Sequence, residues 1–246
     1  MDMHPNRHLP IEGTFNIRDL GGYTAGERET LWRRVLRADG LHRLTEAGRD
    51  MLVGEGVRTV IDLRRPAELE TQPNPFATDA RVRYVNVSLF ENLAPTYGPQ
   101  IDTLHALYVR ALEERAEAIA AILGMIAEAD DGAVLFHCTA GKDRTGLIAA
   151  LLLGNAGVGD DEIIADYALT GRMIAPLLDE ILAHAAERGM DETAMRPLLA
   201  CAPETMRATL DHIGQGHGSI AGYLNALGLG DEVAARLKSR LTGDQA

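Results

Sequence analysis

The sequence is poor in the residues that build disulfide frameworks and metal sites. Its 246 residues include two cysteines, Cys138 and Cys201, and no Cys-x-x-Cys pair. Disulfide scaffolds and structural zinc sites need more cysteines or closely spaced Cys and His ligands, so we predict no metal and no other cofactor. Free thiols are typical of a reducing compartment, and we therefore expect a cytoplasmic protein, with export without a leader left open.

Long hydrophobic runs and positive charge are also scarce. The longest aliphatic run, residues 147–153, is much shorter than the roughly 18–20 residues of a membrane span, and residues 1–10 lack the apolar stretch of a signal peptide. The net charge is -12, from 24 Lys and Arg against 36 Asp and Glu. We therefore predict no transmembrane segment and no nucleic-acid partner, because nucleic-acid binders usually carry a basic surface. A local positive pocket for a phosphorylated substrate is still compatible with this balance.

Short β-like runs alternate with helical patterns, which predicts an α/β fold: a central, mostly parallel sheet flanked by helices. Strands are expected at residues 14–17, 33–36, 58–63, 81–88 and 133–136. Helices are expected after an N-cap at Thr45 to near Gly54 or Gly56, at 66–70, at 99–127 and from Arg144. Residues 160–241 read as helical, with breaks at Gly171, Gly189, Pro203, 214–218 and 228–230. No linker interrupts the chain, so we predict a single domain over residues 1–246.

The segment with the clearest chemistry reads VLFHCTAGKDRTG, residues 134–146. A Cys and an Arg separated by five residues lie between an apolar strand and an apolar helix. A short loop in this place lets successive backbone N–H groups converge on one point, and the helix N-terminus adds its positive end. We therefore predict a phosphate-binding loop made of Thr139, Ala140, Gly141, Lys142, Asp143 and Arg144.

Two residues of this loop have the chemistry of phosphoryl transfer. The same amides and helix end lower the pKa of a thiol at Cys138, and a thiolate is a nucleophile for phosphorus. Arg144 can hold two phosphoryl oxygens bidentately. We expect His137 to brace the loop and the Thr145 hydroxyl to hydrogen-bond the sulfur. A nucleotide-binding P-loop is excluded, because the pattern requires Ser or Thr after the Lys, where this sequence has Asp143.

The motif HCTAGKDRTG resembles the active-site signature of the protein tyrosine phosphatase superfamily. Its Lys-Asp pair resembles a bacterial branch related to mycobacterial phosphatase B and the Listeria tyrosine/lipid phosphatase. The segments FNIRDLGGY (15–23), LRADGLHRLTEAG (36–48), RTVIDLRRPAE (58–68) and GSIAGYLNALGL (218–229) resemble that branch in the same order. The resemblance implies a tyrosine-phosphatase-like sheet flanked by helices, and phosphotyrosine, phosphoserine/threonine or phosphoinositide substrates.

The general acid is open between two aspartates. Many members of the superfamily use a Trp-Pro-Asp loop, and this sequence, with Trp32 as its single tryptophan, has none. Asp143 lies in the loop itself, and the resemblance also points to Asp62, at the carboxyl end of an expected strand. The alternative role of Asp62 is an ion pair with Arg64 or Arg65. The alternative role of Asp143 is to brace the loop. Lys142 adds a second fixed charge suited to substrates with extra phosphates, unless it is a solvated loop lysine.

We therefore predict a metal-independent phosphatase of the protein-tyrosine/dual-specificity type that works through a phosphocysteine on Cys138. Its partner would be a phosphorylated protein or a phosphoinositide. A non-catalytic module that reads phosphopeptides or inositol lipids is the alternative from another class. Sulfur transfer of the rhodanese kind also uses a loop cysteine, but the segment from Lys142 to Gly146 disfavours it.

Overall fold

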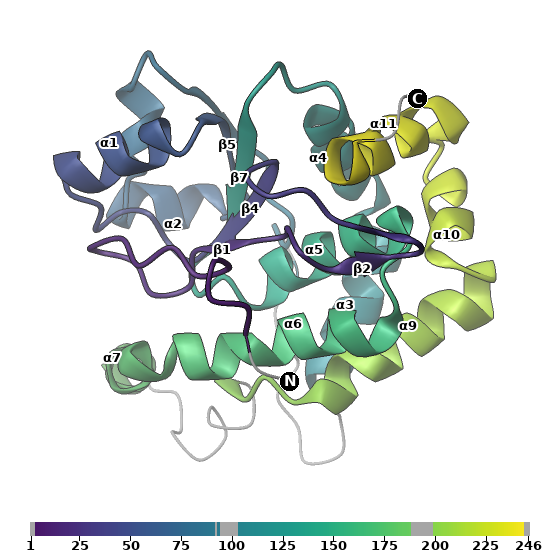
Figure 1. Ribbon diagram of the computed structural model, residues 1–246. Coiled ribbons are helices and arrows are strands. Elements are labelled where there is room, and N and C mark those ends of the chain that lie inside the picture. The colour runs from purple at the N-terminus through teal and green to yellow at the C-terminus, as the bar shows by residue number, and fades with distance from the viewer. Residues whose placement is uncertain (1–2, 92, 94–102, 188–198, 244–246) are drawn as a thin grey trace.

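The computed structural model describes residues 3–91, 93, 103–187 and 199–243 (Figure 1). The strands are β1 (Arg18–Asp19), β2 (Thr24–Ala25), β3 (Arg28–Glu29), β4 (Val35–Ala38), β5 (Val57–Asp62), β6 (Arg83–Asn86) and β7 (Ala133–His137). The helices are α1 (Glu46–Gly54), α2 (Pro66–Thr71), α3 (Thr103–Glu114), α4 (Ala116–Ala127), α5 (Asp143–Ala156), α6 (Asp160–Met173), α7 (Leu178–Glu187), α9 (Pro203–His217), α10 (Ile220–Ala226) and α11 (Gly230–Thr242). Two 3-10 turns are η1 (Pro75–Thr78) and η2 (Ala175–Leu177).

Five strands form one sheet in the order β1-β4-β7-β5-β6. Strands β4, β7, β5 and β6 are parallel, and β1 pairs antiparallel with β4. The predicted α/β fold with a mostly parallel sheet is therefore confirmed. Because β7 is the middle strand, the loop that follows it emerges at the centre of the carboxyl edge, where open α/β sheets bind their ligands.

The alternation of side chains along the central strand builds two cores, one on each face of the sheet. Ala133 and Leu135 of β7 pack in a cluster with Leu52 of α1. Val134 and Phe136 point to the opposite face and join a larger cluster that includes residues of α3 to α6 and α9 to α11. Successive strand residues face opposite sides, so a wholly apolar strand is one that is covered on both. Figure 1 shows the sheet between these two groups of helices.

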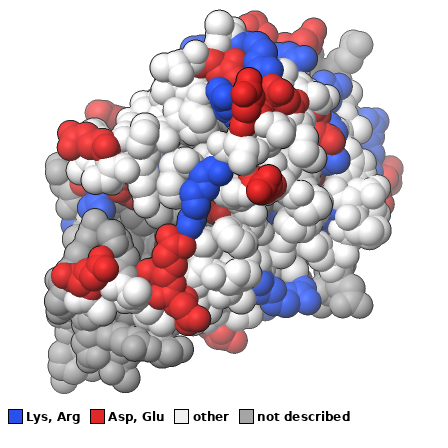
Figure 2. Space-filling view, turned by 90° about the vertical axis from the view of Figure 1, so that its left-hand side faces the viewer, with Lys and Arg blue, Asp and Glu red and all other residues white. Residues whose placement is uncertain are grey.

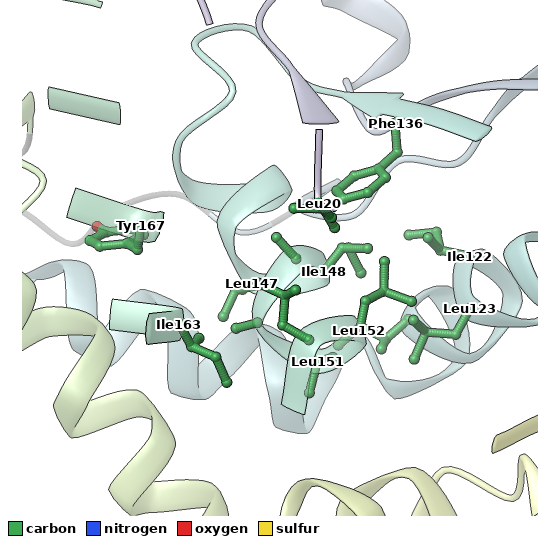
Figure 3. Packing of buried hydrophobic residues seen from close by; sticks show 14 of the residues in the cluster. Leu20, Ile122, Leu123, Phe136, Leu147, Ile148, Leu151, Leu152, Ile163 and Tyr167 are labelled. Atoms are coloured by element: carbon green, nitrogen blue, oxygen red, sulfur yellow. The ribbon is translucent and has the colours of Figure 1, made fainter. Parts of the chain in front are cut away.

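Helix α5 is the centre of the larger core. Leu147, Ile148, Leu151 and Leu152 are each at most 1 % exposed. Figure 3 shows them between Phe136 of the sheet, Ile122 and Leu123 of α4, and Ile163 and Tyr167 of α6. The helix is therefore covered on nearly all sides, as its uniformly apolar sequence predicts. This burial fixes the position of its N-terminus, where the chain returns from β7.

Several element boundaries differ from those predicted. The helix expected over residues 99–127 is divided at Arg115 into α3 and α4; its first residues, 99–102, lie outside the described part. The Arg115 guanidinium donates to the carbonyls of Ser88 and Leu89, at 3.1 Å each, and Arg115 itself leaves the helical conformation with φ -117°. A tertiary contact, which no periodicity reveals, therefore ends the first helix.

Glycine marks some helix ends in the last third of the chain and not others. Gly171 lies inside α6, so the break predicted there was wrong. Within the break predicted at 214–218, Gly214 and Gly216 lie inside α9, but the helix does end at His217 and Gly218 is its C-cap. Pro203 does begin α9, and a break does separate α10 from α11. Gly189 lies outside the described residues. A glycine in a helix interior costs only about 1 kcal/mol, which tertiary packing readily offsets.

Basic and acidic side chains are mixed on the surface. Figure 2 shows the left-hand side of the molecule as seen in Figure 1, with Lys or Arg next to Asp or Glu over its upper part. Pairs of this kind include Arg81 with Asp79 at 2.7 Å and with Asp50 at 2.6 Å. In the described ranges, no helix combines the length and apolarity that crossing a membrane requires.

Candidate active site

The predicted phosphate-binding loop connects β7 to α5. The strand ends at His137 and the helix begins at Asp143, so residues 138–142 form the turn between them. Cys138, the first residue of the turn, is 2 % exposed. The structure thus places the Cys at the end of the central strand and Arg144 in the first turn of the central helix, which is the arrangement that the sequence predicted.

The carbonyl groups of the loop are held from behind. Those of residues 139–141 accept hydrogen bonds from the Gly40 amide at 2.8 Å, the Asn16 side chain at 3.0 Å and the Arg37 guanidinium at 2.7 Å, in that order along the chain. In a trans peptide the N–H points opposite to the C=O of the preceding residue. The amides of residues 140–142 therefore face the other side of the loop, which is where the predicted anion cradle would lie.

Gly141 is required by this conformation. Its φ is +67°, and a Cβ there would lie 2.6 Å from the carbonyl oxygen of Ala38 on β4. Any other residue would be strained in this backbone conformation and would push the loop away from the sheet.

A buried ion cluster fixes Arg37 below the loop. Asp166 of α6 pairs with Arg37, lies 3.3 Å from a nitrogen of Arg18, and accepts from the Tyr23 hydroxyl at 2.8 Å. Burial by itself would raise the pKa of Asp166, but Arg37 and Arg18 outweigh it and lower that pKa to about 2. Burial lowers the pKa of Arg18 to about 10. The cluster ties α6 to β1, β4 and the loop, and it holds two cations against one carboxylate.

Arg144 has a carboxylate partner that the sequence analysis did not single out. Its Nη1 donates to Glu68 Oε2 at 2.7 Å and its Nη2 to Glu68 Oε1 at 3.0 Å. The same Nη2 donates to the Thr139 hydroxyl at 3.0 Å, and that hydroxyl makes a short bond to Glu68. Burial would raise the pKa of Glu68, yet Arg144 holds it well below its ordinary value.

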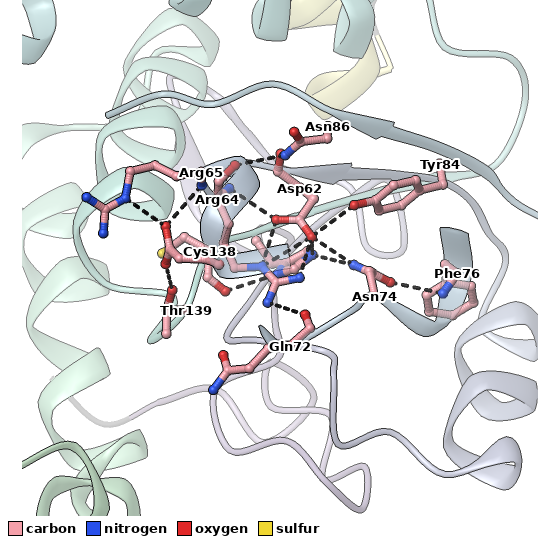
Figure 4. A network of polar contacts seen from close by, with 12 residues as sticks. Asp62, Arg64, Arg65, Gln72, Asn74, Phe76, Tyr84, Asn86, Cys138 and Thr139 are labelled. Carbon is pink, nitrogen blue, oxygen red and sulfur yellow. Dashed lines mark hydrogen bonds and ion pairs between the residues drawn. The ribbon is translucent and has the colours of Figure 1, made fainter. Parts of the chain in front are cut away.

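Asp62 lies in a buried polar network behind the loop (Figure 4). It is fully buried and accepts from Arg64 at 2.7 Å, Asn74 at 3.1 Å and Tyr84 at 3.2 Å, with His137 also at 3.2 Å. Burial opposes ionisation, but His137 and Arg64 together hold the pKa of Asp62 far below its usual range. The geometry favours the ion-pair role over proton donation.

His137 connects this network to Cys138. Its Nδ1 lies 3.0 Å from the carbonyl oxygen of Cys138, and its Nε2 lies 2.8 Å from the Asn74 amide nitrogen. Nδ1 must carry a proton to bond that carbonyl. With its ring fully buried, His137 sits where a brace for the loop is needed.

Asp143 and Lys142 lie on the other side of the loop. Asp143 Oδ1 accepts from the Tyr108 hydroxyl at 2.5 Å and lies 3.3 Å from the Lys142 nitrogen. The side chain of Asp143 is 29 % exposed, whereas that of Lys142 is 1 % exposed. Lys142 is thus not the solvated loop lysine of the alternative reading. Tyr108 also bonds Tyr167 of α6 at 2.9 Å, and its burial raises its pKa well above 10.

The side chains of Thr145 and Cys201 are both buried. The Thr145 hydroxyl is buried and has no hydrogen-bond partner among the described residues, so the bond to the sulfur is not formed here. Cys201 lies against Gly171, and burial raises its pKa to about 11, which suits a packed side chain. In the described part of the chain, no group of three or more His, Cys, Asp or Glu side chains could hold a metal ion.

The residues that sequence reasoning missed lie in motifs that it had noticed. Asn16 and Arg18 belong to FNIRDLGGY, Arg37 to LRADGLHRLTEAG, and Glu68 ends RTVIDLRRPAE. For Arg18 and Arg37 the available signal was a charged residue in a buried strand, because a buried charge needs a partner.

Comparisons with known proteins show which family this chain is similar to. A family model described as the tyrosine phosphatase family matches residues 9–243. A tyrosine-protein phosphatase of Nostoc commune is 36 % identical over 217 residues, which are 84 % of this chain and 73 % of the relative. The triple specificity protein phosphatase PtpB of Mycobacterium tuberculosis is 27 % identical over 278 aligned positions, which cover 96 % of this chain and 99 % of PtpB. Among solved structures, P. aeruginosa TpbA matches with a TM-score of 0.37 and 19 % identity, over 79 % of this chain and 97 % of that one.

The chain belongs to the tyrosine phosphatase family. The predicted resemblance is confirmed, and so is the predicted class of enzyme, a phosphatase of the protein-tyrosine/dual-specificity type.

Proposed function

We propose that the enzyme hydrolyses phosphomonoesters through a phosphocysteine on Cys138. The observation that supports this most directly is the loop whose carbonyls are tied back, so that its amides converge in front of a buried Cys. In the first step the thiolate sulfur attacks phosphorus and the ester P–O bond breaks. In the second step water attacks phosphorus, the P–S bond breaks and inorganic phosphate leaves.

The loop would bind the phosphoryl group with its backbone and with Arg144. The amides of the loop and the N-terminus of α5 would neutralise the oxygens of the transition state, and Arg144 would add a charged, bidentate contact. Thr139, Ala140, Gly141, Lys142, Asp143 and Arg144 thus remain the proposed phosphate-binding residues. Thr145 carries a buried hydroxyl two residues into α5, which becomes the proposed donor to the sulfur when the thiolate re-forms.

We assign the general acid to Asp143 rather than Asp62. The leaving oxygen needs a proton, and its donor must be reachable from the substrate. Asp143 is partly exposed at the start of α5, whereas Asp62 is fully buried behind the loop with four partners. Asp62 would instead position His137, and through it the carbonyl of Cys138.

Phosphotyrosine, phosphoserine/threonine and phosphoinositides are the proposed substrates. The relative PtpB is named a triple specificity protein phosphatase, which supports a broad choice of phosphorylated partner. The buried charge of Lys142 next to the loop suits substrates with more than one phosphate. Both cysteines are free thiols, which supports the proposed reducing, cytoplasmic environment.

The mechanism is tested with p-nitrophenyl phosphate and two variants of the chain. We expect turnover in the presence of EDTA, inhibition by vanadate and no measurable turnover by Cys138→Ser. Cys201→Ser is the matched control, because it removes a buried thiol outside the loop, and it should keep its activity. Turnover that survived in Cys138→Ser, or that stopped in EDTA, would contradict the mechanism. Phosphate binding without any turnover would favour the non-catalytic reader of phosphorylated ligands.

A further inference from the structure

The Nη1–Nη2 edge of the Arg144 guanidinium is occupied in this structure. A guanidinium grips an oxyanion with two N–H groups on one edge, either Nη1 with Nη2 or Nε with Nη2. Nη1 donates to Glu68 Oε2 at 2.7 Å and Nη2 to Glu68 Oε1 at 3.0 Å, and Nη2 also donates to the Thr139 hydroxyl at 3.0 Å. A phosphoryl group that takes the Nη1–Nη2 edge must break both contacts with Glu68, and one that takes the other edge must compete with these acceptors for Nη2.

Glu68 is the residue that holds the arrangement closed. Its two carboxylate oxygens engage both terminal nitrogens of Arg144, and it also accepts from the Thr139 hydroxyl. The side chains of Arg144 and Glu68 are 12 % and 19 % exposed, so the pair is partly shielded from water. Partial shielding strengthens an ion pair relative to one on the open surface. The Glu68 carboxylate makes with Nη1 and Nη2 of Arg144 the same two contacts that two phosphoryl oxygens would make there.

We propose that Glu68 is an internal occupant of the phosphate site, which the substrate must displace before Arg144 can bind it. The proposal rests on the proposed function, since it concerns the same loop. Glu68 would thus be a regulator of affinity at the mouth of the site, supplied by α2 rather than by the loop itself.

Glu68 has a second partner ready when it leaves Arg144. Its Oε2 accepts from the Arg65 amide at 3.0 Å and from Arg65 Nε at 3.2 Å. The first of these bonds closes the capping box at the start of α2. The carboxylate can therefore exchange Arg144 for phosphate while it stays bonded to Arg65, whose side chain is 45 % exposed. This second partner lowers the free-energy cost of the exchange.

The test compares the affinity of inorganic phosphate for three proteins by calorimetry: the wild type, Glu68→Gln and Glu70→Gln. Glutamine keeps the capping box but loses the charge, so the helix should fold. We expect the dissociation constant to fall about three- to tenfold in Glu68→Gln, the range for loss of a partly shielded ion pair. Glu70 is an exposed acid on the same helix, and Glu70→Gln should match the wild type. An unchanged or weaker affinity in Glu68→Gln would overturn the proposal, and a weaker one would make Glu68 a support for Arg144.

A second measurement separates displacement from the simple loss of a nearby negative charge. A crystal structure of the wild type with phosphate bound should show the Glu68 carboxylate away from Arg144 and still bonded to Arg65. Phosphate in the loop with both Glu68–Arg144 bonds intact would overturn the proposal. Neither measurement needs turnover. Suppose that Glu68→Gln binds phosphate more tightly than the wild type and Glu70→Gln, but that the wild type leaves p-nitrophenyl phosphate intact. That result would refute the proposed function and not this inference.

Discussion

At the scale of single residues, the two candidate acids occupy opposite environments. Asp62 is enclosed by cationic and amide donors and cannot approach a substrate without breaking them, whereas Asp143 has a partly exposed carboxylate. Solvent accessibility therefore distinguishes Asp143 from Asp62, which the sequence motifs alone left as equal candidates for the general acid.

This difference gives a prediction about the leaving group. A poor leaving group, such as the alkoxide of a phosphoserine peptide, needs the acid far more than p-nitrophenolate does. Asp143→Asn should therefore lower kcat for the peptide by on the order of 10²–10⁴-fold, and lower it much less for p-nitrophenyl phosphate. Asp62→Asn should show no such dependence on the leaving group and should mainly lower stability, because Arg64 would stay buried without its carboxylate. Steady-state kinetics on both substrates and thermal unfolding of both variants test these expectations. A leaving-group dependence in Asp62→Asn and none in Asp143→Asn would assign the acid to Asp62.

Much of the site was predictable at this scale, because its chemistry is local in sequence. The proposed nucleophile Cys138, Arg144 and the loop amides lie within seven consecutive residues, 138–144, between a strand and a helix. The residues that orient the loop were not predicted. Asn16 is 124 residues away from the carbonyl that it binds, and Arg37 is 104 residues away from its own. Their contacts depend on how the strands pair, which spacing along the chain does not encode.

At the scale of elements, α6 stabilises the sheet through one buried carboxylate. Asp166 connects this helix to arginines of β1 and β4, and Arg37 extends the connection to the loop between β7 and α5. The position of the loop therefore depends on a helix that follows it in the sequence.

The ion cluster predicts a defined loss of stability in acid. The pKa of Asp166 is about 2 in the folded chain, below its ordinary value of 3.8, because Arg37 and Arg18 outweigh the effect of burial. Its contribution is complete above about pH 4 and is lost as the pH falls toward 2, since the unfolded chain then binds the proton first. We expect roughly 2 kcal/mol from this residue over that window. Urea midpoints measured from pH 5 to 2 should fall less steeply in Asp166→Asn than in the wild type.

A control for this prediction lies on the same helix. Asp161 is 91 % exposed, and Asp161→Asn should keep the wild-type slope. Equal slopes in the wild type and in Asp166→Asn would contradict the assignment of the acid sensitivity to the buried cluster.

Sequence reasoning located most elements but misplaced their ends for physical reasons. Strand β7 and helices α1 and α5 were found because apolar runs and an N-cap at Thr45 mark them, and the Thr45 side chain does accept from Gly48 at 3.1 Å. The strand expected at 14–17 lies instead at Arg18–Asp19, because the amides of Phe15 and Asn16 donate to the Asp39 carboxylate. The Asp39 carboxylate, which follows β4, thus takes the place of a backbone acceptor on a neighbouring strand.

At the scale of the whole molecule, the C-terminal helices share a core with the sheet. Met206 of α9, Tyr223 of α10 and Leu241 of α11 belong to the same buried cluster as Phe136 and Ile148. We propose on this basis that residues 1–246 fold as one domain, as the absence of a linker in the sequence suggested.

A single domain should unfold in one transition. The one tryptophan, Trp32, lies against Gly21 and Gly22 near the sheet edge, so its fluorescence reports the N-terminal part. Far-ultraviolet circular dichroism at 222 nm reports the helices, most of which follow residue 102 in the described part of the chain. The two signals should change at the same urea concentration, because elements that share one core unfold cooperatively. A fluorescence midpoint clearly separate from the dichroism midpoint would instead show two independently stable units.

The link between Arg18 and Asp166, 148 residues apart, also bears on when the loop of residues 138–142 can take its conformation during synthesis. A nascent chain that has left the ribosome as far as Arg144 already contains the proposed nucleophile Cys138 and every loop amide. It still lacks the helix that neutralises two arginines beneath them. Orientation of the amides must therefore wait until α6 has emerged, and the enzyme is assembled late although its chemistry is encoded in the middle of the chain.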